Sequence, residues 1–146
     1  MKYNDLEMSI LSCMLLKPSL MENNNLEDKY FKNHIKVWRF MKAFYSKFHT
    51  FDITLMYSVA KNQYNLMMYV EHLLDVEPTT ANFELYQKQL IDLYNEDQKE
   101  KYIIDKVYAE ANNLLVRGIN SIEFVQRIKQ IYKQAEHLYG GENETN

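Results

Sequence analysis

The side chains of this sequence that could do chemistry are four histidines, one cysteine and two groups of carboxylates, and they are scattered along the chain. The histidines are His34, His49, His72 and His137. Zinc sites need histidines one helical turn apart or cysteines at short spacing, and neither pattern occurs. We therefore expect no metal site, and we interpret His34 as a hydrogen-bonded structural residue rather than a catalytic base.

The other candidates for nucleophilic, acid–base or phosphate chemistry lack the neighbours that would activate them. Cys13 lies in an apolar run with nothing beside it to lower its pKa, so we assign it to the core. The carboxylates around Glu71 and Glu96 lie on polar stretches, where solvation explains them. The three glycines form neither GxxxxGK(S/T) nor GxGxxG. We expect a protein that is not an enzyme and holds no cofactor.

A series of basic residues between positions 29 and 47 contains no acidic residue. Its members are Lys29, Lys32, Lys36, Arg39, Lys42 and Lys47. A basic helix face can contact DNA phosphates or an acidic protein partner. The candidate residues for such a face are Lys32, Lys36, Arg39 and Lys42. The alternative is a solvated helix face, since the whole chain has a net charge of −3 and is not built for nucleic acid throughout.

The helix that carries this face is predicted over 33–48, where apolar residues recur at spacings of three and four. That spacing is typical of one face of an amphipathic helix. The residues concerned are His34, Val37, Trp38, Met41, Phe44, Tyr45 and Phe48. We interpret the segment as the central core helix of a small all-helical domain that packs around Trp38.

Helices are expected on both sides of this segment, because the chain has only three glycines and two prolines to form tight turns. A capping-box pattern from Asn4 to Glu7 starts the first helix, and Pro18 ends it. Asp52 is expected to cap a helix over 53–61, whose inward residues are Leu55, Met56 and Val59.

Another helix is predicted over 63–74, and a loop follows it, with Thr79 or Thr80 as the next N-cap. No proline or glycine occurs from 81 to 115, so one long helix is predicted there. Residues 95–101 are polar without exception and are expected to form an exposed neck. Gly118 should end this helix, and Asn120 should cap a last helix that turns back as a hairpin.

The hairpin is predicted to dimerise, because its apolar stripe is too wide for a single neighbouring helix to cover. The residues expected in this contact are Ile104, Val107, Tyr108, Ala111, Leu115, Phe124, Val125, Ile128, Ile131, Tyr132, Ala135 and Leu138. The predicted fold is therefore all-α: a small globular helical head, then a long helix and an antiparallel helical hairpin that dimerises.

The predicted division is a head over 1–94, a neck and hairpin over 95–139, and a polar tail over 140–146. No apolar run is long enough to span a membrane, and the N-terminus lacks the apolar core of a signal peptide. With a single cysteine, a reduced cytoplasmic setting and a soluble protein are expected.

Several short motifs, in their order along residues 5–139, resemble the N-terminal domain of DnaB-type replicative helicases. The motif residues are Glu7, Ile10, Leu11, Leu15, Leu16 and Pro18, then Phe31, His34, Trp38 and Phe40, then Asp52, Thr54 and Leu55, and finally Pro78, Thr79, Thr80, Ala81, Asn82 and Tyr86. The chain departs from the family in lacking the glycine pair usual before Tyr69, the arginine usual near Asp97, and the ATPase domain.

This resemblance implies a helical head and a dimerising hairpin, the parts with which such helicases build a hexameric collar and receive primase and loader proteins. The first interpretation is a non-enzymatic DNA-replication protein of a bacterium, phage or mobile element. It would contact a replicative helicase, its loader or primase, either as a regulator or as the N-terminal domain of a larger helicase. The alternative is a DNA-binding protein that uses the 29–47 face, although only weak nucleic-acid binding is expected.

Overall fold

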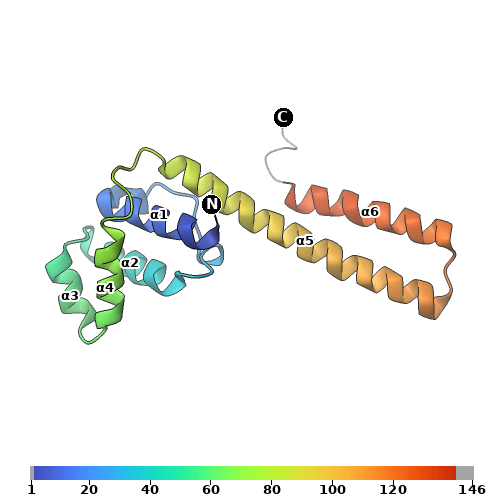
Figure 1. The fold of residues 1–146 in the computed structure, drawn as a ribbon, viewed down its shortest axis with the longest axis horizontal. Coiled ribbons are helices and arrows are strands. Elements are labelled where there is room, and N and C mark those ends of the chain that lie inside the picture. Colours follow the sequence, from blue (N-terminus) through green and yellow to red (C-terminus); the bar gives the residue numbers. More distant parts are fainter. Residues whose placement is uncertain (1, 141–146) are drawn as a thin grey trace. The chain divides into compact units, whose positions relative to one another are not determined.

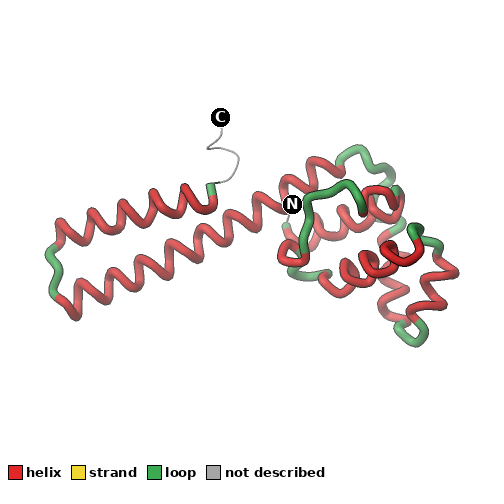
Figure 2. Tube along the Cα trace, turned by 180° about the vertical axis from the view of Figure 1, so that it is seen from behind, coloured by secondary structure: helices red, strands yellow, loops and turns green. Residues whose placement is uncertain are grey.

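In the computed structural model, which describes residues 2–140, every regular element is helical (Figure 1 and Figure 2). The α-helices are α1 Tyr3–Leu16, α2 Ile35–Phe48, α3 Ile53–Ala60, α4 Tyr64–Leu73, α5 Phe83–Arg117 and α6 Ser121–Tyr139. Two short 3-10 helices, η1 Pro18–Met21 and η2 Asp28–Tyr30, lie between α1 and α2. The prediction of an all-α fold is confirmed. Of the predicted tail over 140–146, all but Gly140 lies outside the described residues.

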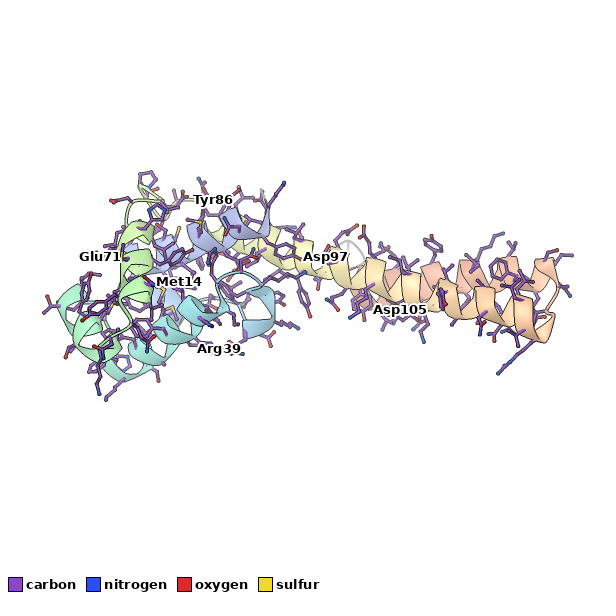
Figure 3. The ribbon with its side chains drawn as sticks, turned by 60° about the horizontal axis from the view of Figure 1, so that its bottom comes forward. Met14, Arg39, Glu71, Tyr86, Asp97 and Asp105 are labelled. Carbon is purple, nitrogen blue, oxygen red and sulfur yellow. The ribbon has the colours of Figure 1, made fainter. Side chains whose placement is uncertain are left out.

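The chain divides into two compact units, with the boundary between Ile91 and Asp92. The first unit is built around α1, which is buried on nearly every side and contacts η1 and α4. Figure 3 labels Met14 in the interior of this unit. The buried residues of α1 are Leu6, Glu7, Ser9, Ile10, Leu11, Ser12, Cys13, Met14 and Leu15.

The prediction that the 33–48 helix is the centre of the core is wrong, because that position belongs to α1. The apolar periodicity of α1 marks only one of its faces. The other face carries the small side chains of Ser9, Ser12 and Cys13, and it is buried as well. Small residues let neighbouring chain segments approach a helix closely, so a face without large apolar residues can still be interior. The capping box predicted at Asn4–Glu7 is also wrong, since α1 begins at Tyr3 with Lys2 at its N-cap.

The amphipathic character predicted for α2 is confirmed. Its buried residues are Val37, Trp38, Met41, Phe44 and Tyr45. The Trp38 ring is 1% exposed and stacks on Phe31 with ring centroids 4.4 Å apart. Aromatic pairs at this distance add to the free energy gained from area burial alone. The opposite face of α2 is exposed and carries the basic residues.

The α3 and α4 helices lie side by side (Figure 1). As predicted, the Asp52 side chain caps α3 by accepting a hydrogen bond from the Leu55 N–H at 2.8 Å. Met56 is fully buried as predicted, but Val59 is 42% exposed and Ala60 takes the inward position instead. The expected cap at Thr79 or Thr80 is wrong, because α5 begins only at Phe83 and the Thr79 hydroxyl accepts from Ala81 N–H in the preceding turn.

In the second unit, α6 runs back along α5 as an antiparallel hairpin (Figure 1). Gly118 follows the last residue of α5 with φ of +69°, the left-handed conformation that glycine adopts without strain. The Asn120 side chain caps α6 through the Glu123 N–H at 2.8 Å, as predicted. The neck is less exposed than predicted, because Lys99 forms an ion pair with Glu136 of α6 and its side chain is only 24% exposed.

The turn between α3 and α4 holds a strained residue. Lys61 has φ of 54° and ψ of −111°, which is close to the first central position of a type II′ turn. Glycine normally occupies that position, because a Cβ atom is crowded there.

Replacing Lys61→Gly should therefore raise the free energy of unfolding by about 1 kcal/mol, as relief of strain outweighs the extra freedom of the unfolded chain. Urea denaturation followed by Trp38 fluorescence measures this change. Lys61→Ala is the matched control, because it removes the same long side chain but keeps the Cβ atom. An equal gain from the alanine variant would show that the turn is not strained.

Candidate functional site

The exposed face of α2 is positioned by a buried carboxylate at the start of the helix. Glu7 of α1 is fully buried and accepts hydrogen bonds from the backbone N–H groups of Asn33 at 3.0 Å and His34 at 2.9 Å. The amide group of Asn33 also donates to it at 3.3 Å. N–H groups at a helix N-terminus lack partners within the helix and attract a negative charge. Glu7 therefore fixes the segment at the start of α2 to α1.

Burial and hydrogen bonding have opposite effects on the pKa of Glu7. Loss of solvent raises the pKa above its usual value, and the hydrogen bonds from the His34 and Asn33 backbone oppose this rise. Tyr69 belongs to the same cluster, since burial and the Glu7 charge together raise the pKa of Tyr69 to about 12. The Tyr69 hydroxyl is buried without a hydrogen-bond partner. The cluster therefore links α1 to the start of α2 and to Tyr69 of α4.

His34 has a structural position, though not the one expected. It occupies the N-cap of α2 rather than the buried face, its ring stacks on Tyr69 with centroids 4.9 Å apart, and its Nε2 lies 2.6 Å from the Asn4 side-chain oxygen. Burial lowers the pKa of His34 below its usual value, so the neutral form is favoured. This environment supports a packing role for His34.

A second acidic residue, Asp28 of η2, organises the basic face itself. Its carboxylate accepts a hydrogen bond from the Trp38 indole N–H at 2.8 Å, and lies 3.1 Å from Arg39 Nε and 3.6 Å from Lys42 Nζ. The hydrogen bonds from Trp38 and Arg39 hold the pKa of Asp28 below its usual value. Sequence reasoning missed this residue, although it immediately precedes Lys29, because the basic series was followed only from Lys29 onward.

The four basic candidates are all exposed in the structure. Lys32 precedes α2, and its ammonium group lies 4.3 Å from the centroid of the Tyr3 ring. Lys36, Arg39 and Lys42 follow along α2 at spacings of three. The structure therefore places Lys36, Arg39 and Lys42 on one helix. Asp28 lies beside Arg39 and Lys42.

The candidate contact residues of the hairpin differ in exposure. Those left exposed are Ile104, Tyr108, Leu115, Val125, Tyr132 and Leu138. Those half-buried are Val107, Ala111, Phe124, Ile128 and Ile131. Ala135 is fully buried. Ala135 is therefore covered within the hairpin, and the exposed group is the part of the predicted contact most available to another molecule.

Most of the exposed group lies on one side of the hairpin. Arg127 of α6 binds Glu110 of α5 at 3.2 Å and so marks the opposite side. At about 100° per residue, Ile104, Tyr108 and Leu115 lie about 120–160° around α5 from Glu110. By the same measure, Val125 and Tyr132 lie about 140–160° around α6 from Arg127. We call these five residues the apolar hairpin face; Leu138 lies instead on the side of Arg127.

Within residues 2–140, no group of three or more His, Cys, Asp or Glu side chains is arranged to hold a metal ion. In the same range, no helix is both long and apolar enough to cross a bilayer. The Cys13 thiol is buried, and burial followed by the Glu77 charge raises its pKa to about 11. The surfaces that remain as candidates for function are the basic face of α2 and the apolar hairpin face.

A comparison with protein families matches residues 1–92 to the DnaB-like helicase N terminal domain. The match covers more than half of the chain and does not include an ATPase domain. No curated protein and no solved structure matches the chain significantly. The resemblance found in the short motifs is thus confirmed over residues 1–92 by the family comparison.

Replacing Glu7→Ala should lower the free energy of unfolding by about 3 kcal/mol, because the Asn33 and His34 N–H groups lose their charged acceptor and a cavity remains. Asp5→Ala, an exposed carboxylate of the same helix, is the control and should change stability by less than about 0.5 kcal/mol. Urea unfolding curves give both values. Equal effects of the two substitutions would show that the Glu7 hydrogen bonds do not stabilise the contact between α1 and α2.

Proposed function

Because the chain belongs to the family of DnaB-like helicase N-terminal domains, we propose that it is a non-enzymatic DNA-replication protein that works through protein contacts. Its partners in this proposal are a replicative helicase, a helicase loader or primase. The chain acts either as a regulator or as the N-terminal domain of a larger helicase. In either case it works in the cytoplasm of a bacterium or on a phage or mobile-element replicon.

The family match carries the replication role, and the apolar hairpin face supports the part of the proposal that concerns protein contacts. Ile104, Tyr108 and Leu115 are 66%, 78% and 84% exposed, although each is a large apolar side chain. Val125 and Tyr132 add 49% and 53% exposed side chains on the same side. Large apolar side chains gathered on one exposed side of a domain are typical of contact surfaces.

Association of two hairpins through this face is energetically reasonable. If each hairpin hides a few hundred Å², burial at about 25 cal/mol per Å² contributes on the order of 10 kcal/mol for each partner. Lost rigid-body and side-chain freedom offsets several kcal/mol of this gain. Micromolar or tighter self-association is therefore expected.

We expect the full chain to be a dimer at tens of micromolar concentration, and Val125→Asp with Tyr132→Asp to make it a monomer. The two carboxylates would be placed in the apolar contact without partners. These positions suit the test better than Ile128 and Ile131, which are half-buried within the hairpin itself. Sedimentation equilibrium measures the mass of each form.

Gln130→Asp with Gln134→Asp is the matched control, because it adds the same charge to exposed polar positions of the same helix. This control variant should remain a dimer. Trp38 fluorescence should be unchanged in both variants, since the substitutions lie outside the first unit. A monomeric unmodified chain would contradict the role of the apolar hairpin face.

The partner is identified by recovering bound host proteins with the intact chain as bait. We expect a replicative helicase, its loader or primase to be recovered, and the Val125→Asp, Tyr132→Asp variant to recover markedly less. The Gln130→Asp, Gln134→Asp variant should recover as much as the unmodified chain. Recovery of proteins unconnected with replication would refute the proposed function.

A further inference from the structure

A shallow hollow on the exposed side of α2 is lined by two cationic side chains and one carboxylate. It has a volume of about 350 Å³ and is lined by Asp28, Arg39, Lys42, Ala43 and Ser46. Ala43 and Ser46 are small, so space is left between the two long cationic side chains. Figure 3 shows Arg39 on the outer side of α2. The hollow has room for a carboxylate side chain.

The charges around this hollow do not cancel. The single carboxylate of Asp28 contacts both Arg39 and Lys42, whose side chains remain 64% and 57% exposed. Lys36 and Lys47 lie within about 80° of Arg39 around the helix and add two further positive charges to the same side. The face keeps an excess of positive charge after Asp28 is counted, so it attracts anionic groups.

The two central cations are held in place before any ligand arrives. Asp28 is anchored by the indole N–H of Trp38, which is itself buried and stacked on Phe31. Arg39 and Lys42 are held by Asp28 in turn. Ordering long side chains is a major cost of association, and pre-ordering lowers that cost. The buried core thus helps to prepare this surface for binding.

We propose that the basic face of α2 binds an acidic segment of a partner protein, with a carboxylate of that segment in the hollow between Arg39 and Lys42. The inference rests on the proposed function and deepens it by giving the chemistry of one partner contact. A peptide is favoured over nucleic acid because the excess positive charge is confined to one face of a single helix. Residues 1–91 also contain ten basic and ten acidic residues, which leaves no broad field to attract DNA.

The test measures binding of a short fluorescein-labelled polyglutamate peptide to the full chain by fluorescence anisotropy. Binding should weaken from low to physiological salt, and Arg39→Glu with Lys42→Glu should weaken it at least about tenfold. Trp38 is the only tryptophan and is bonded to Asp28, so its emission should change on binding. Single- and double-stranded oligonucleotides are measured in the same way.

The matched control is Lys17→Glu with Lys61→Glu, which makes the same change in net charge at exposed positions outside α2. It should keep most of the peptide affinity. Three results would overturn the inference: no peptide binding to the unmodified chain, equal weakening by the control, or tighter binding to oligonucleotides that depends on Arg39 and Lys42. The last result would assign the face to nucleic acid.

The result of the peptide-binding test can be separated from the result of the partner-recovery test of the proposed function. The Val125→Asp, Tyr132→Asp variant should bind the peptide normally, because its changes lie in the second unit. If the unmodified chain recovers a helicase or loader but does not bind the peptide, only the inference about α2 fails. If the chain binds the peptide but recovers no replication protein, the proposed function fails and the chemistry of the face stands.

Discussion

A helix that is buried on nearly every side must find partners for the polar groups that it buries, and this requirement on α1 determines much of the first unit. The Glu7 carboxylate is paired with the backbone at Asn33 and His34. The Ser12 hydroxyl donates to the Leu73 carbonyl and accepts from the Glu77 N–H. Two loops far apart in the sequence are therefore fixed to one helix by its own polar side chains, since leaving these groups unpaired would cost more than the bonds contribute.

The two candidate surfaces depend on this framework to different degrees. The basic face of α2 is positioned by contacts with the core. Glu7 fixes the start of the helix, and Trp38 holds Asp28, which contacts Arg39. The apolar hairpin face needs only two helices in register, which the Arg127–Glu110 and Lys99–Glu136 ion pairs help to set. Exposed ion pairs contribute little stability, so the hairpin depends more on its half-buried apolar residues.

Local signals in the sequence predicted the helices well, because each signal acts within a few residues. Asp52, Asn120 and Gly118 end or begin helices as expected, and the apolar spacing around Trp38 predicted which side of α2 is buried. The Asn4–Glu7 pattern was misleading, because Glu7 is used by a segment 26 residues away. No periodicity within α1 reveals such a partner.

The candidate surfaces were predictable as sets of residues but not in their arrangement. The heptad pattern listed twelve apolar hairpin positions without separating those that face the neighbouring helix from those left exposed, such as Ala135 and Tyr132. The charge pattern found Arg39 and Lys42 but not the hollow between them, which requires the placement of Asp28 outside the helix. Both distinctions depend on tertiary contacts, which spacing along one chain does not encode.

The burial of Cys13 has a practical consequence for how this protein can be studied. Its thiol is fully shielded, and a pKa of about 11 leaves almost none of it as the reactive thiolate at neutral pH. Since it is the only cysteine in the chain, maleimide reagents should leave the native sequence unlabelled. A single cysteine introduced at an exposed position could then carry a spin label or a dye without first removing the natural one, and distances between labels would become directly measurable in the intact protein.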